Sequence, residues 1–121
     1  MATKPEVKAK KQILDRLKST CAMLSYTLDL ETHAGDAFST PTLDITGTIN
    51  CAFFPQQWGV PFAIEVKRFD GKGKLTERQA HTIRKKHAAG VAVFLIEDEL
   101  GLEDFLAWLR ARCPWRPCPD V

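Results

Sequence analysis

Three neighbouring residues, Glu65-Val66-Lys67, combine residue types that can carry chemistry. They lie in an apolar stretch that predicts a β-strand, where alternate side chains share a face. Glu65 and Lys67 would then point one way while Ile64 and Val66 point into the core. A carboxylate and an ammonium are costly to bury unless they are paired, hydrogen-bonded or metal-bound. The pattern therefore fits either a catalytic pair or an exposed ion pair on an edge strand.

A second carboxylate, Asp44, lies between Leu43 and Ile45 in the preceding predicted strand. Consecutive strands usually lie side by side, so we expect Asp44 to face Glu65 across the sheet. Two carboxylates at that distance repel each other unless a divalent cation lies between them, and Mg²⁺ commonly combines one or two carboxylates with water and a substrate phosphate. Lys67 could then position or deprotonate the attacking water, or stabilise charge in the transition state.

The elements that would hold these residues are predicted from the spacing of apolar side chains. Apolar residues that recur every three or four positions predict helices, and alternating apolar and polar residues predict strands. The predicted elements are a helix (4–24), three strands (26–31, 42–49 and 62–67), a helix (76–88), a strand (91–96) and a closing helix around 102–109. Gly90 is expected to end the second of these helices.

The order of these elements predicts an α/β fold. The step from the third strand through a helix to the fourth is a crossover of the βαβ type. We therefore expect a mixed central sheet flanked by helices on both sides, with a further helix at the C-terminal end. The unbroken apolar run at 91–96 predicts a strand that is covered on both faces.

A chain of 121 residues, 45% of them hydrophobic, has the size and apolar content of one domain. We expect a single domain over 1–121, with its core in about 4–112 and an irregular proline-rich tail at 113–121. No apolar run approaches the roughly 18 residues that span a bilayer, and no secretory signal is recognisable. Four scattered cysteines are too few for a disulfide scaffold, which favours reduced thiols and a cytoplasmic protein without a membrane partner.

The net charge of +2 conceals a strong partition along the chain. The segment 21–66 contains five acidic residues and no lysine or arginine, whereas 67–86 contains eight basic residues and two acidic ones. Carboxylates that hold a metal, next to cations that attract phosphates, suit a metal-dependent phosphodiester enzyme. Charge blocks also occur on solvated helix faces, so charge alone leaves both interpretations open.

The ordered set of Asp44, Glu65-x-Lys67 and Gln79 on the following helix resembles the PD-(D/E)xK nuclease superfamily. More narrowly, Gly71-Lys-Gly-Lys-Leu75 ahead of Gln79, followed by Gly90-Val-Ala-Val, is similar to the virus-type replication-repair nuclease (VRR-NUC) family. The resemblance covers about residues 42–96.

This resemblance implies a restriction-endonuclease-like αβββαβ core and hydrolysis of DNA phosphodiesters with Mg²⁺, for which Mn²⁺ can substitute. It implies that Asp44, Glu65 and the main-chain carbonyl of Val66 bind the metal. Lys67 would be the catalytic lysine, and Gln79 would contact the attacking water or the scissile phosphate. Stand-alone members of the family, often phage-encoded, resemble dimeric Holliday-junction resolvases, which implies a homodimer in a bacterial or phage-infected cell.

We therefore expect a metal-dependent DNA endonuclease that acts on branched structures such as Holliday junctions or flaps. Two other functions stay open at this stage. One is a non-catalytic nucleic-acid-binding protein that keeps the nuclease fold, and the other is a restriction-type endonuclease.

Several candidate residues also have purely structural explanations. Gln79 completes a capping box with Thr76, and Glu6 could favour the N-terminal end of a helix dipole rather than contact a metal. Basic residues around the site could contact phosphates or form a solvated face: Lys72, Lys74, Arg78, Arg84, Lys85 and Lys86. Aromatic residues of the irregular connection could stack on bases or form a subunit interface: Phe53, Phe54 and Trp58.

Overall fold

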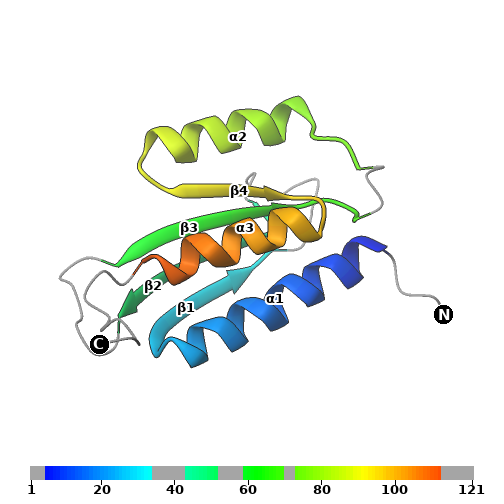
Figure 1. Cartoon of the computed structure of the whole chain (residues 1–121). Coiled ribbons are helices and arrows are strands. Elements are labelled where there is room, and N and C mark those ends of the chain that lie inside the picture. Colours follow the sequence, from blue (N-terminus) through cyan, green and yellow to red (C-terminus); the bar gives the residue numbers. More distant parts are fainter. Residues whose placement is uncertain (1–4, 34–42, 52–58, 70–72, 113–121) are drawn as a thin grey trace.

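The computed structural model describes residues 5–33, 43–51, 59–69 and 73–112 of the chain (Figure 1). Its elements follow one another as α1 (Pro5–Met23), β1 (Tyr26–Thr32), β2 (Ile45–Cys51), β3 (Val60–Val66), α2 (Glu77–Ala88), β4 (Ala92–Ile96) and α3 (Glu99–Arg110). The predicted order of helix, three strands, helix, strand and helix is confirmed. The second strand begins later than predicted, so Asp44 immediately precedes β2 instead of lying within it.

The four strands form one sheet in the order β1-β2-β3-β4. β1 pairs with β2 and β2 with β3 in antiparallel fashion, whereas β3 and β4 are parallel because α2 carries the chain back between them. The predicted mixed sheet and βαβ crossover are therefore confirmed. Gly90, with φ +89°, follows α2 and donates its N–H to the carbonyl of His87, so it ends the helix as predicted.

One face of the sheet is covered by α1 and α3, which lie next to each other in Figure 1. Apolar residues at helical spacing bury Ile13 and Leu17 of α1 completely, and α3 contributes Phe105 to the same core. From the sheet, Ile64 and the ring of Phe62 point into this layer. The hydrophobic core thus lies between β3 and these two helices.

The opposite face of the sheet is partly covered by α2. Side chains alternate along a strand, so Glu65 points away from the face that carries Ile64 and Val66. The side chain of Gln79 on α2 reaches Glu65 from that opposite side. Helices therefore flank the sheet on both faces, as predicted, although α2 buries only Thr82 and leaves most of its own surface exposed.

The prediction that 91–96 is covered on both faces is wrong. β4 is the outer strand of the sheet, and α2 is too polar to cover it fully. Leu95 is 39% exposed, and only Ile96 in this strand is buried. A continuous apolar run in the sequence therefore does not distinguish an inner strand from an edge strand that a polar helix covers only in part.

The cysteines depart from the expectation of reduced thiols. Cys51 at the end of β2 is disulfide-bonded, whereas Cys21 of α1 is free and buried. Burial raises the pKa of the Cys21 thiol to about 11. The proline-rich tail at 113–121 and the loop aromatics Phe53, Phe54 and Trp58 lie outside the described residues. In the described part of the chain, none of the helices has the length and apolar character needed to cross a membrane.

Candidate active site

Asp44 and Glu65 lie opposite each other where the pairing of β2 with β3 ends. The last paired residues are Ile45 of β2 and Ile64 of β3. Asp44 comes immediately before Ile45, and Glu65 comes immediately after Ile64. In an antiparallel pair the register continues across such neighbours, which places the two carboxyl groups together. Their interaction contributes to the raised pKa of Glu65.

The position of Asp44 is fixed by main-chain hydrogen bonds on both sides. Its Oδ2 accepts a hydrogen bond of 2.8 Å from the N–H of Val66. Its own carbonyl accepts one of 2.8 Å from the N–H of His33, just beyond β1. The carbonyl of His33 in turn accepts one of 3.0 Å from Nζ of Lys10 on α1. No sequence pattern indicates this chain of contacts, because Lys10 and His33 lack a shared motif.

Glu65 is an almost fully buried carboxyl group, only 3% exposed. Burial, and to a smaller extent the neighbouring Asp44, raise its pKa from 4.5 to about 7 even though the Lys67 ammonium acts in the opposite direction. Near neutral pH this carboxyl therefore exchanges between its protonated and ionised forms. A buried carboxyl with this property is a candidate for binding a cation or handling a proton.

Gln79 connects the acidic and basic members of the site. Its Nε2 donates to Oε1 of Glu65 at 2.7 Å, and its Oε1 accepts from Nζ of Lys67 at 2.7 Å. The same Oε1 accepts from the N–H of Thr76 at 3.0 Å, while the Thr76 hydroxyl accepts from the N–H of Gln79. The capping box and the contact with the site therefore coexist. One side chain thus completes the capping box and joins Glu65 to Lys67, while its contact with the attacking water or the scissile phosphate stays a prediction.

Lys67 follows β3 directly and is held close to Glu65. Its Nζ lies 3.6 Å from Oε1 of Glu65, and its side chain is 11% exposed. Its main-chain N–H donates to the carbonyl of Ile96, which keeps this segment in line with the sheet. Gly73 lies close to the side chain of Lys67. A Cβ at position 73 would lie 3.3 Å from Cβ of Lys67 and 3.3 Å from the main-chain N of Arg68. The glycine-containing loop thus permits a close approach to the lysine.

We call Asp44, Glu65, Lys67 and Gln79 the Asp–Glu–Lys–Gln cluster. Asp44 immediately precedes β2, Glu65 and Lys67 lie at the end of β3 and directly after it, and Gln79 lies in the first turn of α2. They are linked by the hydrogen bonds and the ion pair described above. The arrangement joins paired carboxyl groups, an ammonium and a carboxamide at one end of the sheet.

The metal-binding capacity of the cluster depends on oxygen donors from both side chains and main chain. The described residues contain no group of three or more His, Cys, Asp or Glu side chains suited to a metal. Two carboxylates are nevertheless enough for Mg²⁺ when waters and a further oxygen complete the shell. The N–H of Val66 points to Asp44, and within a strand the carbonyl of the same residue points to the same side. Asp44, Glu65 and the Val66 carbonyl therefore fit a Mg²⁺ site.

The other predicted contacts are distributed unevenly around the cluster. Most of the basic candidates are exposed on α2 or just ahead of it, and these form no hydrogen bond or ion pair with the cluster: Lys74, Arg78, Arg84 and Lys85. Lys86 is half-buried. Lys72 and the side chain of Glu6 lie outside the described residues.

Gln79 and Thr76 allow capping to be separated from support of the site. Thr76→Ala should lower the free energy of unfolding by about 1 kcal/mol, because it removes the acceptor for the Gln79 N–H. Gln79→Ala should cause a similar loss and also weaken Mn²⁺ binding by about tenfold or more, because Glu65 and Lys67 lose their shared partner. Urea unfolding and calorimetric titration with Mn²⁺ measure the two effects. Equal Mn²⁺ affinity in both variants would contradict the assigned role.

The chain was compared with protein-family models, with curated proteins and with solved structures. None of the three comparisons gave a match. The chemistry of the Asp–Glu–Lys–Gln cluster is therefore the basis for a functional proposal.

Proposed function

We propose that this protein is a Mg²⁺-dependent DNA endonuclease of the VRR-NUC family, with a restriction-endonuclease-like core. The convergence of Asp44, Glu65, Lys67 and Gln79 at one end of the sheet is the observation that carries the proposal. These residues match the order and types of the PD-(D/E)xK motif. The basic surface of α2 next to them suits a polyanionic substrate.

The chain's own residues have distinct roles in this proposal. Asp44, Glu65 and the Val66 carbonyl hold the Mg²⁺, which supplies charge neutralisation at the phosphate and lowers the pKa of bound water. Lys67 places its ammonium beside the reacting phosphate and stabilises the negative charge that develops there. The carboxamide of Gln79 holds the side chains of Lys67 and Glu65 next to each other by hydrogen bonds to both. Mn²⁺ is expected to replace Mg²⁺ because it accepts the same oxygen donors.

The proposed substrate is branched DNA such as Holliday junctions or flaps. A homodimer suits a symmetric junction, because a twofold axis brings two sites to two equivalent strands. We place the protein in the cytoplasm, where such DNA is available, on the strength of the proposed substrate. The disulfide at Cys51 gives no support to that location.

The test is incubation of the full chain with end-labelled four-way junctions, flaps and linear duplexes, with Mg²⁺ or with EDTA. We expect cutting of the branched substrates only when Mg²⁺ is present. Asp44→Asn is the matched control, because it removes the charge and keeps the shape of the side chain. Branched DNA that is bound but never cut would instead support the non-catalytic alternative. Cutting at fixed sequences in linear duplex would support the restriction-type alternative.

A further inference from the structure

The sheet face that carries the Asp–Glu–Lys–Gln cluster continues away from it along two further rows of side chains. Cross-strand pairing places Glu31, Thr46 and Ala63 in one row, directly beside the row of Asp44 and Glu65. A following row contains Asp29, Thr48 and Pro61. Rows on one face are two residues apart, or about 7 Å. The surface next to the cluster is therefore continuous with it.

This face holds a groove of about 250 Å³, whose lining includes the row of Glu31, Thr46 and Ala63 beside the cluster and no member of the cluster itself. Small side chains at Thr46, Thr48 and Ala63 form its floor and leave the space open. Gly47, between the two threonines, faces the other side, where a Cβ would lie 2.6 Å from Cζ of Phe62. The volume is slightly below the range of about 300–1,000 Å³ typical of pockets for drug-sized ligands. It suits one nucleotide and is too small for a base pair.

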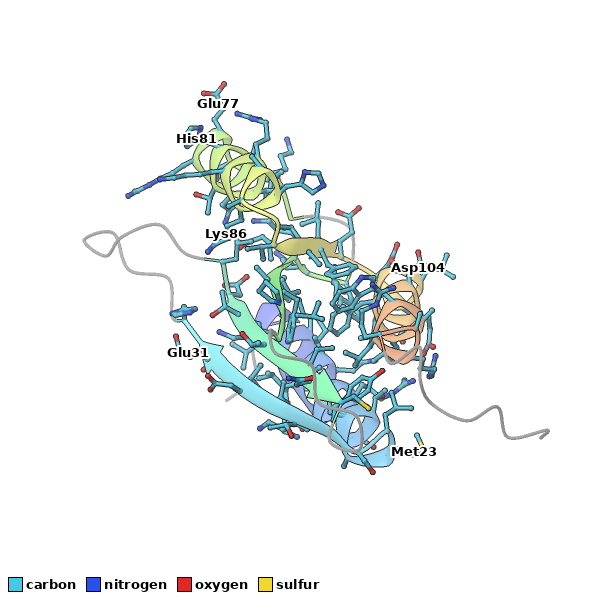
Figure 2. The ribbon with its side chains drawn as sticks, turned by 90° about the vertical axis from the view of Figure 1, so that its left-hand side faces the viewer. Met23, Glu31, Glu77, His81, Lys86 and Asp104 are labelled. Carbon is cyan, nitrogen blue, oxygen red and sulfur yellow. The ribbon has the colours of Figure 1, made fainter. Side chains whose placement is uncertain are left out.

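The two walls of the groove carry opposite charges. Lys86 of α2 lines one wall, and Asp29 and Glu31 of β1 line the other. Lys86 comes seven residues after Gln79, about two helical turns, so both side chains leave α2 on the same face. The described residues offer the Lys86 ammonium no ion-pair partner. Figure 2 shows Lys86 and Glu31 on one flank of the molecule and Asp104 of α3 on the other.

We propose that this groove is a subsite for the single nucleotide next to the scissile phosphate, an inference that rests on the proposed function. A nucleotide complements the groove, because its anionic phosphate suits the wall with Lys86 and the hydrogen-bond donors of its base suit the acidic wall. The phosphate contacts Lys86, as phosphates commonly contact lysine. The exocyclic amino group of cytosine, adenine or guanine donates to Glu31 or Asp29, whereas thymine offers these carboxylates only its N3–H.

The subsite also bears on why the substrate would be branched. A nucleotide enters a groove of this size only when its base is unpaired. Extruding a base from an intact duplex costs stacking and pairing energy, whereas bases at a branch point are already partly free. The groove therefore favours an unpaired base with an exocyclic amino group (cytosine, adenine or guanine) over thymine beside the cut.

The test is NMR titration of the full-length ¹⁵N-labelled protein without divalent metal. The probes are deoxycytidine monophosphate, deoxythymidine monophosphate and inorganic phosphate. The cytidine nucleotide should shift the amide signals of Thr46, Gly47 and Thr48 and bind about tenfold more tightly than the thymidine nucleotide. Glu31→Gln should reduce that preference, and Lys86→Ala should weaken both nucleotides by about tenfold. Lys18→Ala is the matched control and should change neither, because Lys18 is an exposed lysine on α1, which covers the opposite face of the sheet.

The outcomes separate the subsite from the nuclease proposal. Equal shifts with phosphate and with both nucleotides, or no shifts in the groove, overturn the subsite even if the protein cuts junctions. Selective shifts that depend on Glu31 and Lys86 support it even if no DNA is cut, in which case the nuclease proposal fails alone.

Discussion

Lys67→Met is expected to reduce Mg²⁺-dependent DNA cutting by about 10²–10⁴-fold while leaving the fold intact. Methionine keeps the length and apolar stem of the side chain and removes its ammonium. That ammonium lies 3.6 Å from Oε1 of Glu65 and donates to Gln79. Gln79 retains its hydrogen bond from the N–H of Thr76, so the first turn of α2 keeps its cap. Single-turnover cleavage of a labelled junction measures the loss.

Lys85→Met is the control for this variant. Lys85 is an exposed lysine on α2, so its replacement removes one charge without touching the Asp–Glu–Lys–Gln cluster. It should weaken DNA binding and make that binding slightly less salt-dependent, with little change in the rate on bound substrate. Similar single-turnover rates for the Lys67 and Lys85 variants would show that Lys67 acts only through overall charge.

The sequence predicted the fold and the position of the cluster for a definite physical reason. Periodicity fixes which face each side chain takes, so the opposite directions of Ile64 and Glu65 followed from the strand alone. The rule that consecutive strands lie side by side then brought Asp44 to Glu65. Both inferences use local pattern and neighbour order, and both agree with the structure.

Other features depend on contacts that no local pattern encodes. The link from Lys10 to His33 joins a side chain to a carbonyl 23 positions away, and it becomes visible only when α1 is packed beside β1. The capping box and the catalytic interpretation of Gln79 looked like rivals because sequence positions do not show how many partners one carboxamide oxygen accepts. The disulfide at Cys51 was missed for a similar reason, since composition does not fix pairing.

The position of Asp44 ahead of β2 has a chemical consequence. The pairing of β2 with β3 ends at Ile45 and Ile64, so the N–H of Val66 donates to the side chain of Asp44 in place of a main-chain carbonyl of β2. The Val66 carbonyl is left on the same side as both carboxyl groups. The end of the β2–β3 pairing thus creates the cluster of oxygens that the proposed Mg²⁺ site requires.

The stability of the metal-free protein is expected to fall as pH rises from about 4.5 to about 7. Glu65 has a pKa of about 7 in the folded chain, against an ordinary value of 4.5. Below pH 4.5 the carboxyl is protonated in both folded and unfolded chains, so its contribution is fully present. Between these values only the folded chain keeps the proton, and the contribution is lost as the buried carboxylate becomes charged.

Glu65→Gln should remove most of this pH dependence and stabilise the metal-free protein above pH 7 by about 1–2 kcal/mol. Glutamine keeps an oxygen for the Nε2 of Gln79 and never ionises. Asp44→Asn should leave part of the change in unfolding free energy with pH, because burial is the larger cause of the raised pKa of Glu65 and Asp44 is the smaller one. Thermal unfolding between pH 4 and 8 with EDTA measures these effects, and equal slopes in wild type and Glu65→Gln would contradict them. Added Mg²⁺ should restore wild-type stability at high pH and leave Glu65→Gln unchanged, because a cation offsets the charge that burial penalises.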